Sequence, residues 1–510
     1  MYKVRVLQEI DDRLDAEYYN PAALSTLKKM ENKGTVTTFG SLVNEGYRVV
    51  YHGTDSINGL KDSELLPFLS PTQIDPNGAI SFDDADKLPL YYKERYPKGL
   101  AKVGEILVEV KGNVSKVGIV PLDFPKNLMI SGSLYKATLD PKRADSHYVL
   151  AFLKSRHGQI LKNRLTSNTI INYIAKDALY SIPVIEFGEK AQKYIGDKVR
   201  QAEQLRAWAK SVQQQAVELL PAYIREIHRY EAQSYRAKDI VPERLDSLFY
   251  YPDYIALERK MKAKGCNRLG LIAKQIKDSW NKKKAETFEY YEIGGLDITT
   301  GQVSSTKTQT VGAPSRAKTK VQQGDVLVST VRPNRKNVGF IVDSVTDSEM
   351  VATSGFSVLR FSSLAQAAFY HAWLRSDDAT AQLMRWNSGS AYPAIDDDVP
   401  LNIIVPEFEQ EFVDSWGQKL LDAQFAYVCA RKLTEVAKTL VEALIEGQLT
   451  EQQLIQAQQA LDDGDNSLDK AILGKLSNEG YSIEGATPLF SDIDELSRLM
   501  ESAAQAEVEA

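Results

Sequence analysis

Two long stretches of the chain repeat apolar residues every three or four positions, which is the spacing of one face of an α-helix. One stretch runs from Glu186 to Leu220 and the other from Glu407 to Ile445, and neither contains a proline. At about 1.5 Å per residue, each helix would be roughly 50–60 Å long. A small domain cannot cover so long an apolar face, so we expect the helices to pair with each other or with a partner protein. The alternative is that both helices lie in an ordinary core.

The sequence before each long helix mixes short strands, turns and short helices. In both places a glycine and an acidic residue open an apolar strand. A polar loop, a second strand, an amphipathic helix, another polar loop and a last apolar strand follow. The main segments are 104–108, 148–154, 167–173 and 181–185 in the first place, and 324–328, 367–374, 387–392 and 402–405 in the second. This mixture is typical of a compact α+β domain.

These parallels indicate a duplication. Arg13-Leu14-Asp15 recurs as Arg244-Leu245-Asp246. Further matches follow in the same order and at a nearly constant offset: Gly104–Val108 with Gly324–Val328, Lys116–Ile119 with Asn337–Phe340, Ser131-Gly132 with Ser354-Gly355, Phe152–Ser155 with Trp373–Ser376, Glu186-Phe187 with Glu407-Phe408, and Gly196 with Gly417. Collinear matches over so long a span are not expected by chance, so we infer that one unit occurs twice.

The duplication divides the chain into five predicted parts. They are a first globular domain (1–185), a first long helix with its connection (186–235), a second globular domain (236–406), a second long helix (407–449) and a C-terminal extension (450–510). The extension begins with a glutamine-rich helical pattern and continues into weakly patterned sequence.

Composition narrows the class of protein. The chain is 43% hydrophobic and 25% charged, which is ordinary for a globular protein. No apolar run is long enough to span a bilayer, and Met1–Ile10 lacks the apolar core of a signal peptide, so we expect a cytoplasmic protein. Its two cysteines exclude a disulfide framework and a cysteine-rich zinc site, and its five histidines are scattered.

Charge is distributed unevenly. The net charge is −6, but the 13 acidic and 3 basic residues from Glu451 onward account for −10, which leaves +4 for the rest. Within Gly301–Phe340, seven cations stand against Asp325 alone. This pattern is compatible with a polyanionic partner such as nucleic acid, or with a solvated surface.

No catalytic constellation is present in the sequence. There is no G-x-x-x-x-G-K-[ST] phosphate loop, and no Pro-Pro dipeptide for the active-site tetrapeptide of a DNA amino-methyltransferase. We therefore expect a protein that is not an enzyme and binds no cofactor or metal of its own.

The polar loops of both copies carry the donors and acceptors that reading DNA requires. Arginine suits guanine and asparagine suits adenine in the major groove, while lysine contacts phosphate. The alternative is that these loops are simply turns, which use the same residue types. The candidate DNA-binding residues are Lys111, Asn113, Ser115, Lys116, Asn168, Thr169, Asn172 and Tyr173 in the first copy. In the second they are Lys307, Arg316, Lys318, Lys320, Arg332, Asn334, Arg335, Lys336, Arg385, Asn387, Ser388, Ser390 and Tyr392.

The duplicated order resembles the specificity (S) subunits of type I restriction–modification systems over about residues 5–450. The resemblance lies in Arg-Leu-Asp near the start of each half, in the Gly-Glu/Asp-x-Leu-Val strand followed by Val-Gly, and in the proline-containing strand before each helix. That strand is Ile182-Pro183-Val184 in the first copy and Ile404-Val405-Pro406-Glu407 in the second. The family's Pro-x-x-x-Glu-Gln helix entry survives in part at Pro406–Gln410 and is degraded at Glu186–Lys190. The extension has no counterpart in the two-repeat plan.

The resemblance implies an α+β fold with two tandem target-recognition domains. Each domain is followed by a long helix, and the two helices pack as an antiparallel coiled coil with pseudo-twofold symmetry. Each domain would bind one half of a bipartite target in double-stranded DNA, and the helices would set the distance between the half-sites. Two methyltransferase (M) subunits, which use S-adenosylmethionine, would dock on the helices. An ATP- and Mg-dependent restriction (R) subunit would join in a cleaving system.

Two other classes of function remain open at this point. A fused or degenerate restriction–methylation enzyme would need the cofactor motifs that the sequence lacks. A non-catalytic coiled-coil adaptor that binds protein would show no preference among DNA sequences.

Overall fold

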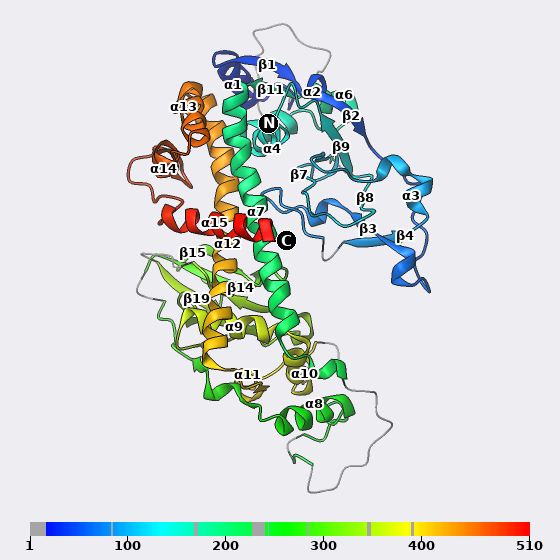
Figure 1. Ribbon diagram of the computed structural model, residues 1–510, viewed down its shortest axis with the longest axis vertical. Coiled ribbons are helices and arrows are strands. Elements are labelled where there is room, and N and C mark those ends of the chain that lie inside the picture. Colours follow the sequence, from blue (N-terminus) through cyan, green and yellow to red (C-terminus); the bar gives the residue numbers. More distant parts are fainter. Residues whose placement is uncertain are drawn as a thin grey trace. The chain divides into compact units, whose positions relative to one another are not determined.

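The computed structural model describes residues 17–82, 85–167, 172–226, 240–242, 244–282, 285–343, 348–388 and 392–509. The chain forms two compact units (Figure 1). Unit 1 consists of Met1–Ala207 with Cys429–Ala510, and unit 2 consists of Trp208–Val428. Each unit contains one globular head and a segment of each long helix, so the units differ from the linear five-part division predicted from the sequence, which stays a prediction.

The head of unit 1 combines short strands with short helices. Its elements are α1 (Pro21–Glu31), β1 (Thr35–Thr38), α2 (Phe39–Leu42), β2 (Val43–Tyr47), β3 (Leu65–Leu69), β4 (Asp86–Pro89), α3 (Tyr92–Arg95), β5 (Ile106–Glu109), β6 (Lys111–Gly112), β7 (Val117–Ile119), β8 (Met129–Ile130), β9 (Leu134–Leu139), α4 (Ser146–Lys154), α5 (Arg156–Asn163), β10 (Asn172–Tyr173), α6 (Lys176–Tyr180) and β11 (Pro183–Glu186).

The head of unit 2 has the same mixture. Its elements are α8 (Pro252–Ala263), β12 (Asn267–Arg268), β13 (Lys274–Ile276), β14 (Thr287–Leu296), β15 (Val303–Gln309), β16 (Ala317–Lys320), β17 (Val326–Ser329), β18 (Val338–Phe340), β19 (Glu349–Thr353), β20 (Phe356–Arg360), α9 (Leu364–Leu374), α10 (Asp377–Arg385), α11 (Val399–Asn402) and β21 (Ile404–Val405). The α+β prediction is confirmed.

Each head is built around an antiparallel sheet whose central strand is the repeated Gly-Glu/Asp strand. In unit 1 the strand order is β2-β9-β5-β7, and in unit 2 it is β13-β20-β17-β18. All four residues of β5 and of β17 are buried, which explains their continuous apolar run. Unit 2 has a second four-stranded sheet, β15-β14-β19-β16, and unit 1 has a three-stranded one, β4-β3-β8.

The acidic residue that opens each central strand has the same structural role in both heads. Glu105 accepts a hydrogen bond from the backbone N–H of Lys102 (2.8 Å), and Asp325 accepts one from Gln322 (2.9 Å). Each acid also pairs with a cation on the neighbouring strand: Glu105 with Lys136 (2.8 Å) and Asp325 with Arg360 (2.7 Å). The preceding glycines have φ of +75° and +87°, a region that favours glycine. The motif therefore fixes a turn and an ion pair.

The Arg-Leu-Asp motif is also structural where it is described. Arg244 donates to the carbonyl oxygens of Trp386 (3.1 Å) and Asn387 (2.9 Å), and it pairs with Asp246 (2.8 Å). It therefore ties the start of the second copy to the loop after α10. The first-copy counterparts Arg13, Leu14 and Asp15 lie outside the described residues.

The two predicted long helices are present as α7 (Glu189–Leu219) and α12 (Gln410–Glu446) (Figure 1). Within unit 1, Arg206 of α7 donates to Thr434 of α12 (2.8 Å). Within unit 2, Tyr427 of α12 donates to Gln213 of α7 (3.3 Å). From the first of these contacts to the second, the residue number increases in α7 and decreases in α12. The two helices therefore pair with each other in antiparallel order. The twofold relation expected between the heads stays a prediction.

The C-terminal extension is folded as part of unit 1. It contains α13 (Glu451–Asp462), α14 (Ser467–Leu473), the hairpin β22–β23 (Leu476–Ser477 and Gly480–Tyr481) and α15 (Ile493–Glu509). Thr450 caps α13 by accepting from the backbone N–H of Gln453 (3.4 Å). The sequence predicted only the first of these helices, because the pattern that follows is short and interrupted.

Candidate nucleic-acid interface

The loop that follows β5 in unit 1 is shaped by the buried carboxylate of Glu109. This carboxylate accepts hydrogen bonds from the backbone N–H groups of Asn113 (3.2 Å), Ser115 (3.0 Å) and Lys116 (3.1 Å). Gly112 has φ +120°, and a Cβ there would lie 2.7 Å from Glu109 Oε1. With its backbone held from inside, the loop exposes the side chains of the predicted residues Lys111, Asn113 and Ser115 and half-buries Lys116.

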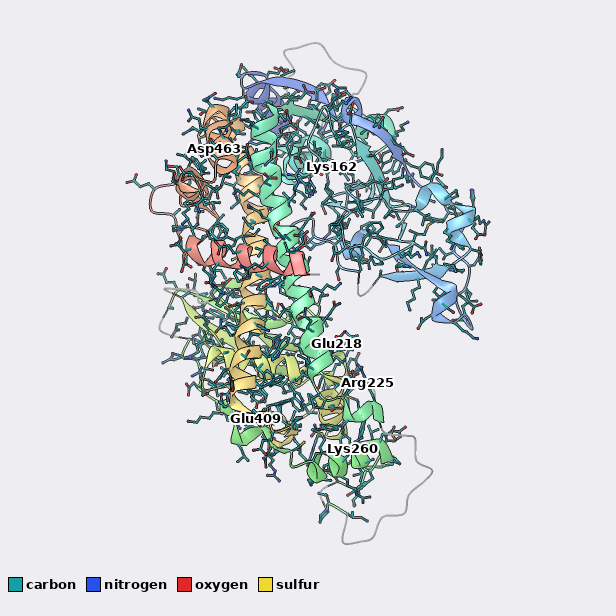
Figure 2. All side chains as sticks on the ribbon, viewed as in Figure 1. Lys162, Glu218, Arg225, Lys260, Glu409 and Asp463 are labelled. Atoms are coloured by element: carbon teal, nitrogen blue, oxygen red, sulfur yellow. The ribbon has the colours of Figure 1, made fainter. Side chains whose placement is uncertain are left out.

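A buried lysine also supports this loop. Lys162 of α5 is fully buried and donates to the carbonyl oxygen of Val114, which lies in the left-handed region at φ +49° (Figure 2). Burial, with a smaller effect of Lys154, lowers the pKa of Lys162 to about 7. No pattern in the sequence singles out Lys162, because the second copy has Leu383 at the equivalent position.

The structure joins the two predicted loops of unit 1. Strand β6 pairs antiparallel with β10, which places Asn172 opposite Gly112 and Tyr173 opposite Lys111. Beside this pairing lies a cavity of about 340 Å³ with a largely polar lining: Glu17, Asn113, Val114, Asn163, Thr166 and Asn172. Predicted residues that are distant in sequence therefore form one surface. Asn168 and Thr169 lie outside the described residues.

Arg48 joins this surface, although no motif in the sequence singles it out. Its Nη1 donates to the hydroxyl of Tyr173 (3.1 Å), and its Nε donates to the carbonyl oxygen of Gly132 (2.6 Å). The guanidinium carbon lies 5.3 Å from the centre of the Tyr173 ring. A cation beside an aromatic ring and amide side chains is suited to a nucleic-acid surface.

The corresponding loop of unit 2 is built from a strained backbone. A 3₁₀ turn at Pro333–Arg335 is flanked by Arg332 (φ +52°) and Lys336 (φ +53°), both in the left-handed region. Residues other than glycine rarely adopt this conformation. The backbone N–H of Arg332 donates to the carbonyl oxygen of Pro393 (2.7 Å), so the second predicted loop again lies against the first.

Several predicted residues of unit 2 gather at this loop. The Arg332 guanidinium lies 4.8 Å from the centre of the Tyr392 ring, and Tyr392 is 67% exposed. Asn334, Arg335 and Ser388 are exposed. Lys336 pairs with Asp377 (2.6 Å), which reduces its availability to a phosphate and holds the pKa of Asp377 below its usual range.

Two further predicted residues have partners within the head: Arg385 is half-buried and Asn387 is buried. Arg385 stacks on the Phe249 ring at 4.4 Å, donates to the Phe249 carbonyl oxygen (3.2 Å) and pairs with Glu258. Asn387 is buried and donates to the carbonyl oxygen of Met384 (2.8 Å). Both side chains hold the loop against the rest of the head, and their role in DNA binding stays a prediction. Ser390 lies outside the described residues.

The cations predicted as one basic segment in unit 2 separate in space. Lys307 lies on β15, and Lys318 and Lys320 lie on β16, at opposite edges of the sheet β15-β14-β19-β16. Three strand spacings separate these edges, roughly 14 Å. Arg316 is exposed just before β16, and Lys320 pairs with Glu349 (3.0 Å).

Two features are absent from the part of the chain that the structure describes. They contain no group of three or more histidine, cysteine, aspartate or glutamate side chains that could hold a metal ion. None of the described helices combines the length and the hydropathy needed to cross a membrane.

No family model matches the chain, and no curated protein matches it. Among solved structures, an HsdS subunit from Thermoanaerobacter tengcongensis is 13% identical, with 82% of this chain and 97% of that chain covered and a TM-score of 0.27. The type I restriction–modification S subunit from M. genitalium is 15% identical, with coverages of 83% and 95% and a TM-score of 0.34.

A third similar chain comes from a structure that addresses complex assembly and conformational transition of the type I R-M system. It is 14% identical, with coverages of 82% and 98% and a TM-score of 0.27. Over most of its length the chain is similar to type I restriction–modification specificity subunits, the family that its sequence resembles.

Proposed function

We propose that this chain is the DNA-recognition specificity subunit of a type I restriction–modification complex, or of a related methylation-based defence complex. The observation that carries the proposal is the duplicated loop pair. In each head, two polar loops distant in sequence meet through backbone pairing or a backbone hydrogen bond. A tyrosine of each pair lies beside an arginine: Tyr173 beside Arg48, which follows β2, and Tyr392 beside Arg332 of the same loop pair.

The two heads share a framework but differ in the side chains they present. Unit 1 offers the amides of Asn113 and Asn172, which suit adenine. Unit 2 offers Arg332 and Arg335, which suit guanine, together with Asn334. Two heads with a similar framework and different exposed side chains are suited to recognise two different half-sites in one bipartite target.

The proposal extends to the partners. The chain would bind double-stranded DNA without acting as an enzyme, and two methyltransferase subunits carrying S-adenosylmethionine would assemble on its helices. A restriction subunit with ATP and Mg would join if the system cleaves. What supports this part is the paired α7 and α12, which join the two heads in one chain.

The test is selection of targets from random double-stranded DNA by the full chain, with and without its companion methyltransferase. We expect a bipartite motif. If Arg335 reads a base, Arg335→Ala should weaken DNA binding by about 1–3 kcal/mol and relax the sequence preference at that base. If Arg335 contacts phosphate instead, the variant should lower the slope of log affinity against log salt concentration by about 1. Arg332→Ala is the second variant, and Lys475→Ala, an exposed cation of the extension, is the control.

Selection without any enriched motif would overturn the proposal and favour a protein-binding adaptor. If both arginine variants bind DNA as tightly as the unchanged protein, the second head must recognise DNA through another surface.

A further inference from the structure

The loop 113–116 of unit 1, which joins β6 to β7, closes over a buried lysine side chain. Lys162 of α5 is fully buried, and its Nζ donates to the carbonyl oxygen of Val114. Val114 is itself only 2% exposed, so the loop separates this amine from solvent. The partner is a neutral carbonyl group, whereas fully buried lysines are normally paired with an acid.

The backbone of this loop is held closed by its contacts with the rest of the head. The Glu109 carboxylate accepts from three backbone N–H groups of the loop at distances of 3.0–3.2 Å. Val114 has φ +49°, a conformation that a β-branched residue rarely adopts. Because the residues of the loop do not favour this conformation by themselves, closure depends on the contacts with Glu109 and Lys162.

The charges that act on Lys162 come from two neighbouring elements. Lys154 on α4 repels the ammonium form, whereas Glu109 at the end of β5 attracts it. Helix α1 also packs on α5, but through Thr26, which lies 3.0 Å from Nδ1 of His157. Burial, with a smaller effect of Lys154, lowers the pKa of Lys162 to about 7. In the closed loop the amine is therefore mostly neutral above pH 7.

Opening of the loop changes the proton affinity of this lysine. A lysine in water has a pKa of roughly 10.4, so from about pH 7 to pH 10 an open loop binds a proton that the closed loop does not. The closed loop therefore gains stability as the pH rises through this range. Below pH 7 the lysine is protonated in both forms, so closure no longer depends on pH.

The second head lacks this arrangement. Leu383 occupies the position equivalent to Lys162. The loop of the second head is held in part by an ion pair between Lys336 and Asp377 (2.6 Å). A dependence of loop closure on a buried amine is therefore expected in unit 1 alone.

We propose that Lys162 is a positioning residue that couples this loop to proton binding. The loop is closed, with Asn113 and Asn172 lining one polar cavity, while the Lys162 amine is neutral, and it opens when that amine takes up a proton. The closed loop is the form that presents these amides to a base, so proton uptake weakens recognition by the first head. This consequence rests on the proposed function, whereas the coupling itself does not.

The experiment is hydrogen–deuterium exchange of the full chain without DNA. Exchange is read from peptides that cover 110–118 and is corrected for the intrinsic exchange rate at each pH. We expect the protection of this loop to rise at least about tenfold between pH 7 and pH 9, and to change little between pH 6 and pH 7. Peptides that cover 330–337, the equivalent loop of the second head, are the internal control and should show no such rise.

Variants of the full chain assign the effect to the lysine. Lys162→Leu, which introduces the residue type of the second copy, should lose most of the rise in protection. Lys154→Met removes the charge that repels the ammonium form, so the rise should begin at a higher pH and be smaller at pH 9. Lys142→Leu, at an exposed position of the same head, should behave as the unchanged protein. Circular dichroism of each variant checks that it is folded.

A smaller rise in the unchanged protein, an equal rise in the loop of the second head, or an undiminished rise in Lys162→Leu would overturn the inference. A second series at pH 7 adds a duplex that carries the selected target, which should protect 110–118 further. If the pH dependence is present but the duplex gives no protection, the coupling stands and the proposed DNA contact of this loop is wrong.

Discussion

At the scale of single residues, the fold places ionisable groups inside both heads and gives most of them partners. Glu109 is an example, because one carboxylate holds three backbone N–H groups of a candidate DNA loop. In the sequence pattern, Glu109 is only the last residue of an apolar strand. Its role depends on the loop folding back over it, which local pattern does not encode.

Among the histidines that the structure describes, His371 of α9 has the most strongly shifted pKa. It is fully buried against Phe340, with ring centres 5.5 Å apart, and its Nε2 lies 3.2 Å from the carbonyl oxygen of Val338. Burial, with a smaller contribution from the charge of Arg375, lowers the pKa of His371 to about 3.

This depressed pKa predicts acid sensitivity of unit 2. Unfolded histidine takes up a proton near pH 6.5, whereas folded His371 does not, so its contribution to stability is present above that pH and is lost as pH falls toward 3. Between pH 7 and pH 5, the free energy of unfolding should fall by up to about 2 kcal/mol from this residue. Urea titrations at pH 7, 6 and 5 check this result. In His371→Gln that part of the pH dependence should vanish, and an unchanged dependence would contradict the assignment.

At the scale of elements, a glycine in each long helix allows the head to pack closely against that helix. Gly196 of α7 and Gly417 of α12 occupy equivalent positions of the repeat. A Cβ on Gly196 would lie 2.7 Å from the Asp145 carboxylate, and one on Gly417 would overlap the backbone oxygen of Ala365. In each unit a head helix therefore approaches its long helix closely at the same place in the repeat.

This close approach predicts the effect of adding a methyl group. Alanine favours a helix over glycine by about 1 kcal/mol, but overpacking against a backbone atom costs about 1–3 kcal/mol. Gly417→Ala should therefore lower the stability of the protein, as measured by chemical denaturation. Gly196→Ala should do so less, because a side-chain carboxylate can move. Ser415→Ala, on an exposed position of α12, is the control. Stabilisation by Gly417→Ala would show that the helices do not pack there.

An ion pair at the end of α12 has an equivalent in the 3₁₀ turn Tyr223–Glu226, which follows α7. In unit 1, Arg156 at the start of α5 pairs with Glu446 (3.2 Å). At the equivalent positions of unit 2, Asp377 at the start of α10 pairs with Arg225 (3.1 Å), which Figure 2 labels. The contact is kept while the charges are exchanged. Comparison of residue types alone would miss such a pair, since neither position is identical in the two copies.

At the scale of the whole molecule, the boundaries between the two units fall at equivalent positions of the repeat. The boundaries between the units fall after Ala207 and after Val428, which are separated by the same offset as Gly196 and Gly417. Each unit is therefore a head with segments of both long helices. The duplication includes the helices as well as the heads.

If the helices set the distance between two half-sites, their length should control the target. Inserting one helical turn within Gln213–Ala216 adds roughly 6 Å, the rise of about two base pairs. We expect the preferred spacing between half-sites to change while the half-sites stay the same, as read from selected DNA. The same insertion at Gly464–Asn466, in the turn between α13 and α14, is the control and should leave the spacing unchanged. Altered half-sites would contradict the role of the helices as a ruler.

The sequence by itself determined the duplication, the two long helices and the α+β character of the heads. These follow from periodicity and from local turn chemistry, which depend on neighbouring residues. The bounds differ only slightly: the first helix, predicted from Glu186, begins at Glu189. The helices' mutual pairing was also expected, because their apolar faces are too long for one small domain.

Only the tertiary structure decided which polar residues reach the surface. Arg385 and Asn387 have the same side chains as the exposed candidates Arg335 and Asn334. Contacts with Phe249, Glu258 and Met384 nevertheless leave Arg385 half-buried and Asn387 buried. Arg48 reaches the candidate surface through Tyr173, which is far away in the sequence. The order of strands separated cations that lie close in sequence. Burial is set by contacts between distant segments, so the residue type alone cannot assign a side chain to the interior or to the candidate surface.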